Sequence, residues 1–101
     1  MQKAYRALAD PHRRTILRVL RRGERTAGDL ASTTGLSPAA LTHHLTVLKL
    51  ADLVRVERRG QYQVYSLNTT VFQDLVSEVL ALLTDPVPEQ DVPRHITGDA
   101  P

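Results

Sequence analysis

Cysteine and tryptophan are absent from this chain of 101 residues, and aromatic residues make up only 4% of it. The lack of cysteine excludes disulfides, thiolate metal sites and cysteine nucleophiles. No apolar run approaches the roughly 20 residues that a membrane-spanning helix needs. The opening residues MQKAYRALADPHRR are charged from the third position and build no apolar stretch of the kind that a secretory signal has. We therefore expect a cytoplasmic protein without a membrane partner.

Positive charge is concentrated in the first four fifths of the chain. Residues 1–83 carry 12 lysines and arginines against 7 acidic residues, a net charge of +5, whereas residues 84–101 have a net charge of −3. A basic body favours a polyanionic partner. Residues 84–101 also contain four prolines and no apolar periodicity. We predict one domain over residues 1–83 and a flexible, acidic, proline-rich tail over residues 84–101.

Helix-capping signals divide the first fifty residues into four helices. A short helix is expected over residues 3–9. Asp10 followed by proline is a start signal for a helix over residues 11–22, which Gly23 ends.

The next two helices are joined by a glycine turn. Thr26 is expected to cap a helix over residues 27–34, Gly35 makes the turn, and Ser37 caps a helix that runs to about Ala51. Two short helices joined in this way are the sequence pattern of a helix-turn-helix, whose second helix enters the DNA major groove.

The hydrophobic period changes after the fourth helix. Residues 53–59 and 61–67 alternate in the manner of strands, and Gly60-Gln61 forms the turn between them. Residues 68–70 are expected to cap a fifth helix over residues 71–83. The predicted fold class is mainly α with a small β-hairpin, a winged helix-turn-helix.

The fourth helix has one face suited to DNA. At 100° per residue its leucines fall on one side, and the opposite side carries small or hydrogen-bonding residues. These are Ala39, Thr42, His43 and Thr46. Threonine and histidine can hydrogen-bond base edges, and alanine can contact a thymine methyl. A plain solvated face would ordinarily carry lysine and glutamate, so we interpret this face as the one that reads DNA.

Arginines gather at two other places. Arg55, Arg58 and Arg59, with Gln61, surround the hairpin turn, where they suit phosphate contacts better than mere protection of a strand edge. Arg14, Arg18 and Arg21 form a stripe along the second helix, which we interpret as a solvated face.

The fifth helix is apolar over most of its circumference, more than a small domain can cover. Self-association is the economical explanation, with the first helix contributing. The residues predicted at this dimer contact are Tyr5, Leu8, Val71, Phe72, Leu75, Val76, Val79, Leu80 and Leu83.

The adjacent residues His43 and His44 do not suit one metal ion, because neighbouring helical side chains point about 100° apart. We expect His44 to pack in the core and His43 to face DNA.

Three segments together resemble the ArsR/SmtB family of winged-helix repressors. They are LADPHRRTILRVL, TAGDLASTTGLSPAALTHHLTVLKLADLV and RRGQYQVYSLN. The ending YSLNTTVFQDL is similar to the SdpR-like autorepressor subgroup. The resemblance implies a homodimer that binds operator DNA, commonly its own promoter. It further implies DNA contacts by Ser37, Ala39, Ala40, Thr42, His43, Arg58, Arg59 and Gln61.

The chain departs from the metal-sensing members of that family. Their cysteine motif is replaced here by AGDLAST, and the fifth helix has Asp74 and Glu78 but no histidine. We therefore expect no cofactor. The residues left for a nonstandard site are Asp10, His12 and His95, whose imidazole and carboxylate ligands would suit Ni²⁺ or Zn²⁺.

The sequence thus predicts a homodimeric transcriptional repressor that binds double-stranded DNA at a palindromic operator, possibly in its own promoter, with relief by a protein or small-ligand co-regulator. Two alternatives stay open: a metal-responsive regulator that uses the nonstandard site, and a winged-helix interaction module that does not bind DNA. No arrangement of nucleophile, base and orienting residue indicates an enzyme.

Overall fold

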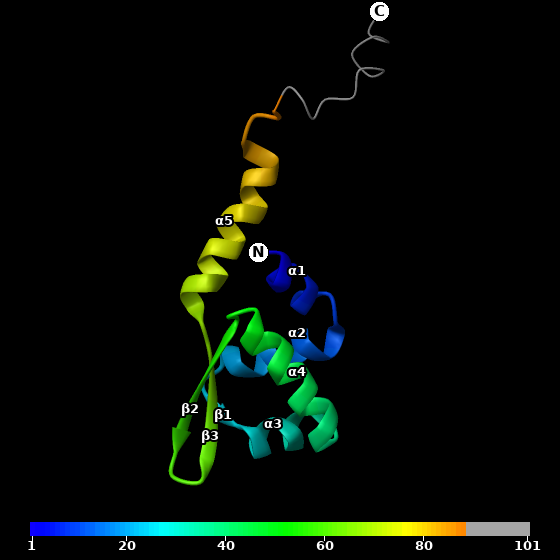
Figure 1. Ribbon diagram of the computed structural model, residues 1–101, viewed down its shortest axis with the longest axis vertical. Helices are drawn as coiled ribbons and strands as arrows, with labels where there is room; N and C mark the ends of the chain where they lie inside the picture. Colours follow the sequence, from blue (N-terminus) through cyan, green and yellow to red (C-terminus); the bar gives the residue numbers. More distant parts are fainter. Residues whose placement is uncertain (89–101) are drawn as a thin grey trace, which may run out of the picture.

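The computed structural model describes residues 1–88, which form a body of helices with a small antiparallel sheet at one side (Figure 1). The elements in chain order are α1 (Gln2–Leu8), α2 (Pro11–Arg21), β1 (Arg25–Thr26), α3 (Ala27–Thr34), α4 (Pro38–Leu50), β2 (Val54–Arg59), β3 (Tyr62–Leu67) and α5 (Thr69–Thr84). The helices agree with the predicted ranges to within two residues at each end. The tail predicted over residues 84–101 lies, from residue 89 on, outside the described residues, so its flexibility and the domain division stay predictions.

Three predicted helix starts are confirmed by side-chain caps. The Asp10 carboxylate accepts hydrogen bonds from the backbone N–H of His12 (2.8 Å) and of Arg13 (3.3 Å). The Thr26 hydroxyl oxygen accepts from the N–H at the third position of α3 (3.1 Å), and the Ser37 hydroxyl oxygen accepts from Ala40 N–H (3.2 Å). Each cap satisfies an N–H group that the helix itself leaves without a partner.

The end of α4 is a Schellman motif. The N–H of Asp52 donates to Lys49 C=O and the N–H of Leu53 donates to Leu48 C=O, each at 3.0 Å. Asp52 occupies the left-handed position of this motif, with φ of 59°. Glycine normally stands there because it has no Cβ to clash with the backbone.

The sheet has three strands, in the order β1-β3-β2. The predicted hairpin of β2 and β3 is present, with Val54 opposite Leu67 and Arg59 opposite Tyr62. The expectation of only two strands was wrong, because Arg25–Thr26 also pairs with β3. Two residues are too few to give an alternating pattern, so β1 has no signal in the sequence.

The start of α5 also differs from the prediction. Residues 69 and 70 belong to the helix, and Asn68 is the cap residue but makes no side-chain capping bond. The Asn68 side-chain oxygen instead accepts a hydrogen bond from the Arg55 guanidinium (3.3 Å). A bond to β2 therefore takes the place of the expected cap.

The core lies between the four N-terminal helices and the inner face of the sheet. Its fully buried large side chains are Ile16, Leu30, Leu48 and Leu53. Figure 1 shows α5 projecting away from this body, with the hairpin at the opposite end of the molecule. Leu75 is the one buried residue of α5. No helix within residues 1–88 combines the length and apolarity that a membrane crossing requires.

Candidate nucleic-acid interface

Helix α4 has the two faces that the sequence predicted. Leu41, Leu45 and Leu48 are buried, and His44 beside them is buried too, with 9% of its surface exposed. Ala39, Thr42, His43 and Thr46 are exposed, and Ala40 is half-buried. The helix is thus held on its apolar side and presents small neutral side chains on the other.

The hydroxyl groups of this exposed face differ in what they can still bind. Ser37 uses its oxygen as the cap acceptor, so its hydroxyl proton remains available to donate. Thr46 donates its proton to Thr42 C=O (2.8 Å) and retains only acceptor capacity. The Thr42 hydroxyl makes no hydrogen bond within the described residues, which leaves it able both to donate and to accept.

His44 is positioned by an arginine from α2. The Arg13 guanidinium approaches His44 Nδ1 at 3.3 Å, and its other nitrogens donate to the carbonyls of Arg6 (3.1 Å) and Ala7 (2.7 Å). A guanidinium only donates, so Nδ1 must be the acceptor of a neutral ring. Burial, opposed by the Asp10 charge and aided by the Arg13 charge, lowers the pKa of His44. This arrangement ties α1, α2 and α4 together and confirms the packed-histidine prediction.

At the tip of the hairpin, the predicted wing residues Arg58, Arg59 and Gln61 are all exposed. Arg58 donates through Nε to Gly60 C=O (3.2 Å), and its terminal nitrogens make no hydrogen bond within the described residues.

Arg59 is the exception in the wing, because two carboxylates hold it. Its guanidinium donates to Glu24 (3.1 Å) and to the neighbouring Glu57 (3.0 Å). These bonds raise the pKa of Arg59 further above its usual value, and the bond to Arg59 lowers the pKa of Glu24. Glu24 was not foreseen: it lies 35 residues from Arg59, and no local pattern joins the two.

The predicted dimer residues gather in one place, with one exception. Helices α1 and α5 enclose an apolar groove of about 450 Å³ lined by Tyr5, Leu8, Phe72, Leu75, Val76, Val79, Leu80 and Leu83. Several of these side chains are open to solvent: Val76 is 64% and Leu83 is 85% exposed. Burial and the charge of Glu78 raise the pKa of Tyr5.

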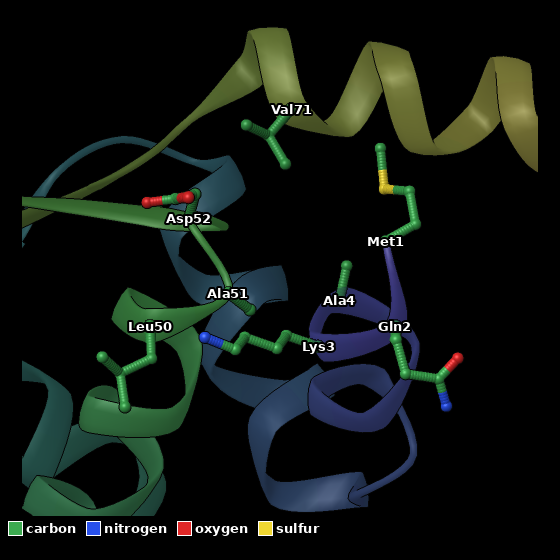
Figure 2. Close-up of a pocket in the computed structure, with 8 residues that line it drawn as sticks. All are labelled: Met1, Gln2, Lys3, Ala4, Leu50, Ala51, Asp52 and Val71. Atoms are coloured by element: carbon green, nitrogen blue, oxygen red, sulfur yellow. The ribbon is translucent and has the colours of Figure 1, made fainter.

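Val71 lies elsewhere. Figure 2 shows it above a separate cavity of about 490 Å³, which the start of α1 and the end of α4 complete. Lys3 and Asp52 are its charged residues, and Ala4 and Ala51 line it with small apolar side chains. This cavity therefore lies where α1 and the start of α5 meet the end of α4.

No group of three or more histidine, aspartate or glutamate side chains within residues 1–88 is arranged to hold a metal ion. The Asp10 carboxylate is occupied as a helix cap. Burial would raise the pKa of Asp10, but the bonds from the His12 and Arg13 N–H groups outweigh it and lower the pKa. The ring of His12 lies 5.6 Å from that of His44 between centroids. His95, the third predicted ligand, lies outside the described residues.

Comparison with known proteins identifies the family. A family model described as a helix-turn-helix domain matches residues 8–57. The transcriptional repressor SdpR of Bacillus subtilis is 44% identical over 80 residues, which span 79% of this chain and 89% of that protein. The chain belongs to the ArsR/SmtB family.

Other ArsR/SmtB relatives agree with this assignment. A probable mercury resistance operon repressor of Streptomyces lividans is 33% identical over 95 residues, 94% of this chain and 76% of that one. Among solved structures, a homodimeric winged helix-turn-helix DNA-binding domain from Mycobacterium bovis is 28% identical, with a TM-score of 0.68 over 86% of this chain and 81% of that one. Family membership confirms the predicted winged helix-turn-helix fold and the predicted class, a DNA-binding transcriptional regulator. The individual DNA-contacting and dimer residues stay predictions.

Proposed function

We propose that this ArsR/SmtB protein is a homodimeric repressor that binds a palindromic operator, its own promoter being the first candidate. The observation that carries the proposal is the exposed face of α4, where small and hydrogen-bonding side chains stand on a helix anchored by buried leucines. Such a face can enter the major groove, where Thr42 and His43 reach base edges and Ala39 meets thymine methyl groups. Occupying a promoter in this way blocks transcription.

The apolar groove supports the dimer. Val76, Leu80 and Leu83 are each more than half exposed, and no element within residues 1–88 covers them. A second copy of the chain related by a two-fold axis would bury these side chains with its own α5. The two α4 helices would then face successive major grooves, which is why we expect a palindromic site.

The wing supplies the contacts that hold the protein in register. Arg58 has terminal nitrogens free of partners in the described residues, and Gln61 beside it is exposed. Both suit the phosphates that flank the operator. We propose that Arg59 joins them only when phosphate competes successfully with Glu24.

Fluorescence anisotropy with a labelled fragment of the chain's own promoter tests this function, with a random duplex as control. We expect tighter binding to the promoter and an affinity that falls linearly with salt on logarithmic axes. Thr42→Val should weaken promoter binding by about 5-fold to 100-fold, the range of one lost base contact, and leave random DNA unaffected. Thr70→Val is the matched control, because Thr70 is exposed on α5 and lies outside the DNA-reading face of α4.

Equal affinity for promoter and random duplex would overturn the assignment to its own promoter. Absence of any DNA binding would favour the interaction-module alternative. The same titration with and without Ni²⁺ or Zn²⁺ tests for metal response. We propose that the protein has no metal cofactor, works as a cytoplasmic regulator rather than an enzyme, and responds to a co-regulator.

A further inference from the structure

A second basic surface lies on the body of the domain, and no residue of α4 or of the hairpin lines it. It is a depression of about 390 Å³ between α2, the β1 strand and α3, lined by Thr15, Arg18, Val19, Arg21, Arg22, Arg25 and Thr33. The sequence pattern led us to interpret Arg18 and Arg21 as part of a solvated stripe. Both are exposed, as that prediction requires, and the structure also brings them together with Arg22 and Arg25 around one depression, which we call the arginine pocket.

The arginine pocket carries four positive charges, and no acidic side chain lines it. The ion pairs formed within residues 1–88 both belong to Arg59 of the wing. Arg25 donates one guanidinium hydrogen to the backbone carbonyl of Glu24 (2.8 Å), which fixes its side chain but does not neutralise it. Gathering like charges in one concave place is unfavourable until an anion joins them.

We propose that the arginine pocket is a phosphate-binding site. Guanidinium groups present paired N–H donors that match two oxygens of a phosphate, and several around one depression can bind a multiply charged group. Thr33 adds a hydroxyl, whereas the Thr15 proton is already donated to Pro11 C=O (3.1 Å). Val19 gives the pocket an apolar wall.

Two sources can supply the phosphate: a free phosphorylated molecule, or the DNA backbone beyond the operator. No residue of α4 or of the hairpin lines the pocket, which favours the free molecule. Arg25 begins β1, which pairs with β3 of the wing, and the preceding Glu24 holds Arg59. A ligand on Arg25 therefore contacts the segment that holds the wing. This link to DNA binding rests on the proposed function, but phosphate binding itself does not.

Isothermal titration of the full chain with inorganic pyrophosphate, against sodium chloride of equal ionic strength, tests the site without DNA. We expect saturable binding that weakens at least 10-fold in the Arg18→Gln/Arg21→Gln variant. The Lys3→Gln/Arg6→Gln variant removes the same charge from exposed residues of α1 outside the pocket, and should bind like the original chain. Thermal unfolding of both variants verifies that they are folded.

Anisotropy of the two variants on promoter DNA over a salt series separates the sources. If the phosphate comes from a free molecule, pyrophosphate binds and the salt slope of the pocket variant matches that of the α1 variant. If it comes from DNA, the slope of the pocket variant alone falls by about 2, since each lost phosphate contact changes it by about 0.9. The proposal is overturned if the two variants bind pyrophosphate with equal affinity and their salt slopes on promoter DNA are also equal.

Discussion

At the scale of single residues, His44 makes the stability of the domain depend on pH. It is buried against α2, its Nδ1 accepts from Arg13, and burial holds its pKa below the ordinary value. The folded state therefore favours the neutral ring, while the unfolded chain takes up a proton near pH 6.5. The contribution of His44 to stability is present above that pH and is lost as the pH falls from about 6.5 towards the folded pKa.

We predict that the free energy of unfolding in urea is lower at pH 5.5 than at pH 7.5, and that His44→Gln makes this difference smaller. His43→Gln is the comparison: His43 is exposed on the same helix and its charge is a lesser cause of the lowered His44 pKa than burial, so it should change the difference less than His44→Gln does. An equal pH dependence in the original chain and in His44→Gln would contradict the assignment.

Asp52 has a backbone conformation that is unfavourable for most residues other than glycine. Its φ of 59° in the Schellman motif costs a residue with a Cβ about 1–2 kcal/mol, and Asp52→Gly removes this cost while adding chain entropy to the unfolded state. We predict a net gain of about 0.5–1 kcal/mol in the free energy of unfolding. Asp52→Ala keeps the Cβ and should give no gain, so equal effects of glycine and alanine would refute the explanation.

At the scale of secondary-structure elements, the helices were predictable because their signals are local. Asp10, Thr26 and Ser37 each bond an N–H group two or three residues ahead, so the sequence pattern contains the whole interaction. The apolar spacing of α4 likewise fixes which side is buried and which is exposed.

The contacts between distant segments were not predictable in the same way. The pairing of β1 with β3 brings together Arg25 and Tyr65, and the wing ion pair joins Glu24 to Arg59. In the arginine pocket, Thr33 joins the arginines only because α3 packs against α2. Each of these contacts depends on the tertiary arrangement rather than on a spacing in the sequence. For the same reason the sequence predicted the wing arginines as one group and did not show that Arg59, unlike Arg58, is held by carboxylates.

The wing ion pair limits what the hairpin can offer to DNA. Glu24→Gln leaves Arg59 with Glu57 alone, so we predict that this variant binds promoter DNA more tightly at low salt. Its salt slope should become steeper by about 0.9, the value of one added phosphate contact.

Asp74→Asn removes a negative charge from an exposed position of α5 and serves as the control for this measurement. Fluorescence anisotropy over a salt series compares the two variants. Equal salt slopes for Glu24→Gln and Asp74→Asn would mean that Arg59 does not contact the DNA phosphates.

At the scale of the whole molecule, the apolar groove makes a sharp prediction about assembly. Val76→Glu places a charge in the groove, where a second copy would have to bury it without a partner. We expect this variant to be monomeric by light scattering after size exclusion and to lose at least 100-fold in promoter affinity, because a single α4 engages only half of the site.

Leu82→Glu is the matched control for the assembly test. Leu82 is 76% exposed on the same helix but lies outside the groove. It should remain dimeric with unchanged DNA affinity. Dimers of the Val76→Glu variant, or monomers of both variants, would show that the groove is not the contact.

One further consequence follows from Asn68. It is the single residue between the last residue of β3 and the first of α5, and its backbone N–H donates to Leu53 C=O (3.0 Å). The joint is therefore too short and too well bonded to act as a hinge. The hairpin and α5 therefore extend from Asn68 in opposite directions with no flexible loop between them (Figure 1). In a dimer formed through α5, the angle at which the two α5 helices cross sets the distance between the two wing tips. That distance in turn fixes how many base pairs separate the two wing contacts on the DNA. Inserting residues at Asn68 would let the dimer form through α5 without fixing the distance between the two wings. The winged-helix body and α5 would each keep their structure.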